Sequence, residues 1–205
     1  MAGPDATGRA GCARRAAAVL LCAASLCGVA AARAERDTPR TAARLAACEA
    51  CHGTAGRPPL AGTPSLSGQQ REFLALQMFL FREGLREAAQ MAKTMDGLTD
   101  NDLLEIASYF ARQPPPRADG KKDPGLYARG AALSRAMGCG GCHGEDFRGQ
   151  QHVPRLANQR EDYLAAAMKA YRDNRRTGID TTMNGILYRV PDADLEALAH
   201  FLAHR

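Results

Sequence analysis

Two short runs in the sequence combine a pair of thiols with an imidazole, a set that can hold an iron porphyrin. The two runs are Cys48-Glu49-Ala50-Cys51-His52 and Cys139-Gly140-Gly141-Cys142-His143. The C-x-x-C-H order is the attachment pattern of c-type haem. Thiols three residues apart share one helix face, so both can add to the haem vinyl groups as thioethers. The histidine that follows then reaches the iron from the same side.

Other sites also use paired cysteines, but the spacing in this chain argues against them. A four-cysteine zinc site usually brings its two pairs within roughly 15–20 residues of each other. Here Cys51 and Cys139 are 88 positions apart. A dithiol oxidoreductase needs neither a second pair nor a histidine after each pair. We therefore predict two haem c groups, attached covalently at Cys48, Cys51, Cys139 and Cys142, with His52 and His143 as axial ligands. A zinc or structural module is the alternative without redox chemistry.

The haem motifs belong to a longer internal repeat. Residues 64–69 match residues 154–159 at an offset of 90, and residues 98–103 match residues 190–195 at an offset of 92. The drift between the two offsets needs loop changes of only one or two residues. Two tandem copies of one domain are the simplest explanation of this pattern.

Each copy has the pattern of a small all-α domain. We expect domains at residues 35–112 and 124–205, joined by a linker at residues 113–123 that its three successive prolines keep extended. The predicted helices cover residues 39–50, 70–83 and 99–112, and in the second copy a helix from Pro124, residues 161–174 and a last helix in register with 99–112. The last helices carry apolar stripes at helical spacing, which we interpret as core. The stripe residues are Leu103, Ile106, Ala107 and Phe110, and Leu195, Leu198, Ala199 and Leu202.

The sixth iron ligand separates an electron carrier from an enzyme, because an open coordination position can take a substrate or peroxide. The candidates are Met78, Met91 and Met95 in the first copy, and Met168, Met183 and His152 in the second. Met78 and Met168 fall within the predicted middle helices, where methionine usually fills core space. His152 has no equivalent in the first copy.

The repeat selects between the remaining methionines. Met91 lies seven positions before Leu98, and Met183 lies seven before the matching Val190. Met95 has no methionine counterpart. We therefore predict Met91 and Met183 as the second axial ligands, in irregular stretches that cross the far face of each haem. Histidine–methionine ligation raises the reduction potential, as in cytochromes c.

The first 34 residues are typical of a secretory signal. Arg14 and Arg15 precede an uncharged run at residues 16–32, and Ala32-Arg33-Ala34 fits a cleavage site. An uncleaved membrane anchor is the alternative, although the run is at the short end for spanning a bilayer. Removal of residues 1–34 also removes Cys12, Cys22 and Cys27, which leaves only the cysteines of the two haem motifs.

The charge of the chain argues against a nucleic-acid partner. Residues 1–34 hold four of the 27 basic residues and one of the 22 acidic residues, so the formal charge falls from +5 to +2 without them. Two haems would add four propionates, which makes the mature protein close to neutral. A nucleic-acid-binding domain usually carries a concentrated excess of positive charge.

With these motifs in place, the chain resembles the class I dihaem cytochromes c of the cytochrome c4 type over most of residues 40–205. The resemblance implies an all-α fold of two tandem class I cytochrome c domains, each around one covalently bound haem. It further implies that the carbonyl groups of Pro64 and Pro154 accept a hydrogen bond from the axial histidines, and that Leu66 and Leu156 pack on the haems. Pro191 departs from the family pattern, because it stands where a hydroxylated helix cap is usual.

The resemblance implies a periplasmic protein, often associated with the membrane, that passes electrons towards terminal oxidases. We expect a one-electron carrier rather than an enzyme, with a quinol-oxidising complex or a dehydrogenase as donor. The first alternative is the dihaem electron-accepting subunit of a larger dehydrogenase, such as a flavocytochrome sulfide dehydrogenase. The second is a dihaem peroxidase, which needs an open iron position.

Overall fold

Helices form the framework of the whole described chain. The structure is a computed structural model that describes residues 1, 3, 39–177 and 180–205. These residues form no strand, apart from an isolated bridge between Gln150 and Val153. The predicted all-α class is therefore confirmed. The predicted signal peptide lies almost entirely outside the described residues.

The chain divides into two units, residues 1–42 and residues 43–205. The second unit contains both haem motifs and the predicted linker, so the boundary between two haem domains remains a prediction. We refer below to residues 43–112 as the first half and to residues 124–205 as the second half. Among the described residues, no helix has both the length and the apolar character needed to cross a lipid bilayer.

In the first half, the helix that leads into the haem motif is longer than predicted. α2 (Pro39–His52) continues through both cysteines and ends at the histidine, and α3 (Arg71–Arg82), α4 (Ala89–Met95) and α5 (Asp100–Ala111) follow. α5 begins with a capping box. The Thr99 hydroxyl accepts from the Asp102 backbone N–H, and the Asp102 carboxylate accepts from the Thr99 N–H at 2.9 Å. This exchange satisfies two amide groups that would otherwise lack a helical partner.

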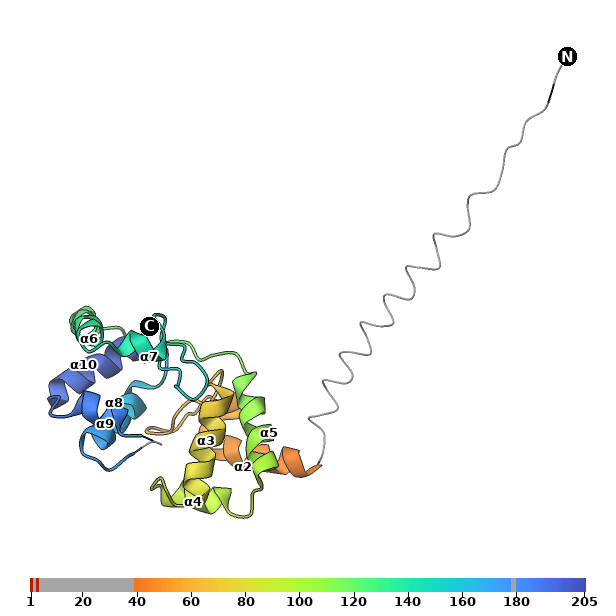
Figure 1. The fold of residues 1–205 in the computed structure, drawn as a ribbon, viewed down its shortest axis with the longest axis horizontal. Helices are drawn as coiled ribbons and strands as arrows, with labels where there is room; N and C mark the ends of the chain where they lie inside the picture. The colour runs from red at the N-terminus through yellow and green to blue at the C-terminus, as the bar shows by residue number, and fades with distance from the viewer. Residues whose placement is uncertain (2, 4–38, 178–179) are drawn as a thin grey trace. The chain divides into compact units, whose positions relative to one another are not determined.

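The second half divides the corresponding segment into two helices (Figure 1). α6 (Pro124–Ala136) ends before Gly138, whose φ of 68° is left-handed, and α7 (Cys139–His143) begins directly after it. The Asp123 carboxylate caps α6 by accepting from the Leu126 N–H at 2.9 Å. α8 (Glu161–Arg172), α9 (Thr182–Leu187) and α10 (Asp192–Ala203) complete this half.

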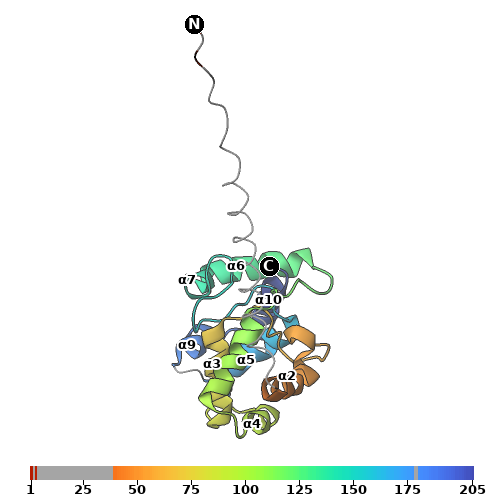
Figure 2. The same cartoon turned by 90° about the vertical axis from the view of Figure 1, so that its right-hand side faces the viewer.

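Each half has its own apolar core under its last helix. All eight residues of the two predicted stripes are buried, from Leu103 to Phe110 on α5 and from Leu195 to Leu202 on α10. α3 packs beside α5, and α8 packs beside α10 (Figure 1). Figure 2 also shows α3 beside α5. The stripes were therefore correctly interpreted as core.

The crossing of α6 and α10 depends on one glycine. A Cβ added at Gly130 would overlap the Ala197 carbonyl oxygen and would lie 2.6 Å from the Cβ of Phe201. Only a residue without a side chain lets the two helix backbones approach this closely. Since α7 follows α6 directly, this close crossing fixes the position of the second haem motif against α10.

Candidate haem sites

The first predicted axial histidine is buried and hydrogen-bonded at one nitrogen. His52 is 6% exposed, and its Nδ1 lies 2.9 Å from the carbonyl oxygen of Pro64. A carbonyl can only accept, so Nδ1 carries the proton and donates. The Nε2 lone pair is then available for a metal, which is the arrangement that metal-bound histidines commonly show.

The second histidine repeats this arrangement. His143 is also 6% exposed, and its Nδ1 donates to the Pro154 carbonyl oxygen at 3.0 Å. Burial lowers the pKa of both His52 and His143 and outweighs the proline carbonyls, which raise it. Both imidazoles are therefore neutral near pH 7, as an iron ligand must be.

The four cysteines of the two haem motifs form no disulfide, and they differ in exposure between the two halves. Cys48 is 8% exposed, Cys51 and Cys139 are half-buried, and Cys142 is exposed. Burial raises the pKa of the Cys48 thiol to about 11 and also raises that of Cys139. A redox dithiol needs at least one thiol with a lowered pKa. Neither Cys48 nor Cys139 is therefore the thiol of lowered pKa that such a catalyst uses.

The predicted methionine ligands lie in short helices, so the expectation of irregular stretches was wrong. Met91 is in α4 and Met183 is in α9, and both are half-buried. Four residues after Met91, Met95 is only 1% exposed, and Leu187 at the matching position is 2% exposed. One turn of helix thus carries a core residue and, next to it, the predicted ligand. The helical spacing of apolar residues could not be recognised in the sequence, because each of these helices has only two turns.

The other candidates are placed as the sequence predicts. Met78 in α3 and Met168 in α8 are each 8% exposed and belong to the apolar cores. His152 is exposed in the loop after α7. The choice of Met91 and Met183 over these three candidates remains a prediction.

The structure brings the predicted haem contacts of each half together. Cys48, Leu66 and Met91 belong to the apolar cluster of the first half or pack against it. Cys139, Leu156 and Met183 pack in the same way against the cluster of the second half. Each half thus gathers an attachment thiol, a thioether and an apolar wall beside a histidine with a free Nε2. This donor set fits a haem c, although ligation itself remains a prediction.

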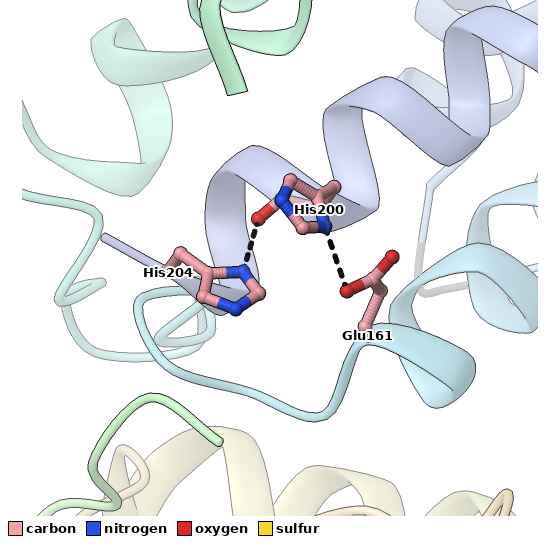
Figure 3. A group of neighbouring side chains, drawn as sticks. All are labelled: Glu161, His200 and His204. Carbon is pink, nitrogen blue, oxygen red and sulfur yellow. Dashed lines mark hydrogen bonds and ion pairs between the residues drawn. The ribbon is translucent and has the colours of Figure 1, made fainter. Parts of the chain in front are cut away.

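Glu161, His200 and His204 form a further cluster of residue types that can bind metals (Figure 3). Hydrogen bonds within the protein occupy most of their polar atoms. His200 is 4% exposed, its Nε2 accepts from the Asp123 N–H at 2.8 Å, and its Nδ1 lies 3.0 Å from Glu161 Oε2. His204 uses its Nδ1 to reach the His200 carbonyl oxygen at 2.9 Å. Since both ring nitrogens of His200 have partners, we interpret this residue as a bridge between the starts of α6 and α8.

The loops that hold the two histidines meet each other at a junction of reciprocal amide contacts. The Gln159 side chain accepts from the Ser65 N–H and donates to the Ser65 carbonyl oxygen, both at 2.8 Å. The Gln69 side chain does the same with Arg155, at 2.7 and 3.0 Å. Ser65 and Arg155 directly follow the prolines that hold His52 and His143. The junction therefore connects the two candidate haem sites.

Sequence reasoning missed these contacts, although a signal was present. Gln69 and Gln159 occupy the same position of the repeat, as do Ser65 and Arg155. A glutamine that recurs at a loop position in both copies can bond to the opposite copy only if the two copies are related by an approximate two-fold axis. That relation cannot be read from the sequence.

Comparisons with known proteins agree with this geometry. The family model described as Cytochrome c matches residues 127–205. Cytochrome c4 from Pseudomonas aeruginosa is 32% identical over 182 residues, which cover 83% of this chain and 90% of that protein. The crystal structure of reduced recombinant cytochrome c4 from Pseudomonas stutzeri superposes with a TM-score of 0.74 at 29% identity, and the match covers 82% of this chain and 97% of that one.

The chain is also similar to proteins that are named as electron acceptors of a dehydrogenase. A thiosulfate dehydrogenase electron acceptor from Thiomonas intermedia is 31% identical over 169 residues, which cover 77% of this chain and 78% of that protein. The similarity therefore extends through both halves in two groups of relatives.

Proposed function

Because this chain belongs to the cytochrome c4 family, we propose that it carries single electrons between a respiratory donor and a terminal oxidase or a similar acceptor. The family membership makes it an electron-transfer protein with two haem c groups and redox protein partners. The haems supply the reversible one-electron chemistry. We assign covalent attachment to Cys48, Cys51, Cys139 and Cys142, and axial ligation to His52, Met91, His143 and Met183.

The observation that carries this proposal is the pairing of a donor set in each half. His52 and His143 each hold Nε2 free through a proline carbonyl, and a half-buried methionine packs against the same cluster as the attachment cysteine. If both axial positions are filled, neither iron has a place for a substrate or peroxide. This arrangement supports a carrier over a peroxidase.

Rigid support of the ligands is what the chain contributes to electron transfer. The Pro64 and Pro154 carbonyls fix the ring orientation of the two histidines, and the glutamine contacts hold the two loops together. Ligands that keep their positions in both oxidation states need little reorganisation. The same contacts keep the distance between the two sites constant, which favours transfer from one site to the other.

We place the protein in the periplasm. Support comes from the signal-like composition of residues 1–34 and from the use of every remaining cysteine in the two haem motifs. N-terminal sequencing of the exported protein tests cleavage after Ala34, and a retained N-terminus would favour an anchor.

A second candidate function is that of an electron-accepting subunit of a dehydrogenase. The relative named as a thiosulfate dehydrogenase electron acceptor favours it. Purification of the untagged protein distinguishes the two candidates. Isolation of the cytochrome alone supports a free carrier, whereas stoichiometric copurification of a dehydrogenase chain supports the subunit.

The ligand assignment is tested by replacing each methionine in turn. Met91→His and Met183→His should each lower the potential of one haem by a few tenths of a volt, a fraction of the roughly 0.8 V range that axial ligands span. Met95→Leu and Met168→Leu are the matched controls, since these residues fill the cores and should leave both potentials unchanged. Redox titration followed by optical spectroscopy measures this. Unchanged spectra and potentials in both ligand variants would show that the assignment is wrong.

A further inference from the structure

The end of α9 exposes large side chains close to the predicted methionine ligand of the second half. Ile186 is 38% exposed, Tyr188 is 65% exposed, and Arg189 is also exposed. In contrast, Leu187 is 2% exposed and Met183 packs against the apolar core. We call Ile186, Tyr188 and Arg189 the α9 patch. The α9 patch is a surface feature and contributes little to the core.

The repeat shows that the fold does not require this patch. At the offset of 92, the matching residues of the first half are Thr94, Asp96 and Gly97. Met95 and Leu187 match each other and are both buried, so the two turns have the same core residue position. The second half carries an aliphatic chain, an aromatic ring and a guanidinium where the first half has a hydroxyl, a carboxylate and a glycine. Its surface is therefore more apolar at this place, and more positive by two charges.

Arg189 has a backbone conformation that suits glycine. Its φ is 59°, and that of Gly97 at the matching position is 69°. This left-handed region is unfavourable for a residue that has a Cβ. The Arg189 guanidinium lies 5.6 Å from the Tyr188 ring centroid, and it forms no ion pair with a carboxylate of the described residues. Unfavourable backbone conformations are concentrated at functional sites, which favours a binding role for this cation.

The chemistry of the α9 patch fits a protein partner with negative surface charge. Tyrosine and arginine are enriched among the residues that dominate binding at protein–protein interfaces. An exposed cation without a partner also raises the association rate with a protein of opposite charge. Ile186 lies three positions after Met183, and side chains at this spacing are neighbours on a helix. A partner on the patch is therefore close to the predicted iron ligand.

We propose that the α9 patch is the docking surface for an acidic one-electron redox protein, which exchanges an electron with the haem of the second half. This inference rests on the haem sites proposed above. One iron changes between the ferrous and ferric states, and the redox centre of the partner changes by one electron in the opposite sense. No proton or chemical group is transferred. The first half has Asp96 in place of Tyr188 and does not offer this surface.

The docking surface is tested by introducing the residues of the first half. Arg189→Gly and Tyr188→Asp are made singly and together in the holoprotein. The ferrous form of each is mixed at low ionic strength with oxidised plastocyanin, an acidic one-electron copper protein. The second-order rate constant should fall by about tenfold in the double variant, at the low end of the range for electrostatic steering. Its dependence on salt should also weaken, because fewer opposite charges then attract each other.

Lys93→Gln is the control that matches Arg189→Gly in charge. Lys93 is an exposed cation of α4, which is the helix of the first half that corresponds to α9. This control should leave the rate constant close to that of the wild type. Arg189→Gly also serves where Tyr188→Asp fails to fold, since glycine suits the backbone at this position.

Redox titration and optical spectra of the same variants separate docking from effects on the haem. Both potentials should stay at wild-type values in Arg189→Gly, and a shifted potential would show that the residue acts on the haem rather than on a partner. Wild-type rate constants in the double variant, with normal spectra, would refute the docking surface and leave the carrier function intact. Equal decreases in Arg189→Gly and Lys93→Gln would assign the effect to net charge. A high-spin spectrum of the wild type would instead contradict the proposed function.

An anionic lipid surface is the other partner that an exposed ring and a cation can bind, and vesicles of phosphatidylglycerol test it. We expect the holoprotein and Arg189→Gly to sediment with these vesicles to the same small extent. Binding that is lost in Arg189→Gly, together with wild-type plastocyanin kinetics in that variant, would assign the patch to the membrane and overturn the proposal.

Discussion

The two halves keep the same contacts at the candidate haem sites and differ in how the surrounding helices are held. His52 and His143 bond to their prolines at nearly equal distances of 2.9 and 3.0 Å. In contrast, α2 is continuous through its haem motif, while Gly138 divides α6 from α7. The comparison indicates that the repeat is constrained at the haem and free to vary in its supports.

The contacts between the first and last helices also differ between the two halves. In the first half, Arg44 pairs with Asp102 and the Tyr109 hydroxyl donates to Glu49 at 2.9 Å. In the second half, the close approach at Gly130 brings α6 against α10, and Arg129 pairs with Asp194 nearer the surface. Both halves thus pair an arginine of the first helix with an aspartate of the last helix, and the second half adds close backbone packing at Gly130.

The largest expected effect comes from removing attachment thiols one half at a time. Cys48→Ala and Cys142→Ala should each weaken haem retention in their own half and leave the other haem in place. We expect the greater loss for Cys48→Ala, since Cys48 is buried and Cys142 is exposed. The mass of the purified chain reports the attached haems. Loss of both haems from one variant would contradict independent sites.

The crossing of α6 and α10 should be sensitive to a single methyl group. Gly130→Ala is expected to destabilise the protein by about 1–3 kcal/mol, because the new Cβ overlaps backbone that cannot move aside. Gly185→Ala is the control, since a Cβ added there would meet no atom within 4 Å and the helix gains up to about 1 kcal/mol. Denaturant unfolding of the holoprotein measures both. Equal stabilities would disprove the role given to Gly130.

The two glutamine contacts should contribute unequally to the junction. Gln159→Ala leaves the buried backbone groups of Ser65 without partners and should cost about 1–3 kcal/mol. Gln69→Ala affects partly buried groups of Arg155 and should cost less. Unfolding free energies give the comparison, and a larger cost for Gln69→Ala would reverse the order. Both variants should also alter the rate of electron transfer between the haems.

The smallest expected effect concerns the caps of the last helices. Thr99→Ala removes the cap of α5 and should cost about 0.5–2 kcal/mol. Pro191 provides no side-chain cap for α10, and Pro191→Thr places a hydroxyl three residues before Asp194. We expect this change to stabilise the second half by up to about 1 kcal/mol. Thermal unfolding should show a lower midpoint for Thr99→Ala and a higher one for Pro191→Thr. A loss of stability in Pro191→Thr would contradict the capping argument.

Much of the fold follows from local patterns that the repeat makes visible twice. The apolar stripes of α5 and α10 predicted the cores, and Pro124 was correctly predicted as the start of α6. Met91 and Met183 were chosen by repeat register after Met78 and Met168 had been assigned to the middle helices. Their helical state was missed, because a helix of two turns shows too little of its period to be recognised.

The sequence by itself determined the chemistry of the two sites, since thiol, imidazole and thioether positions recur at fixed spacing within each copy. Only the tertiary structure decided which residues join the copies. Gln159 meets Ser65, and Gln69 meets Arg155, across about 90 positions of chain. Local periodicity describes the face that a residue occupies on its own helix. It carries no information about the opposing surface, which depends on how the two halves pack together.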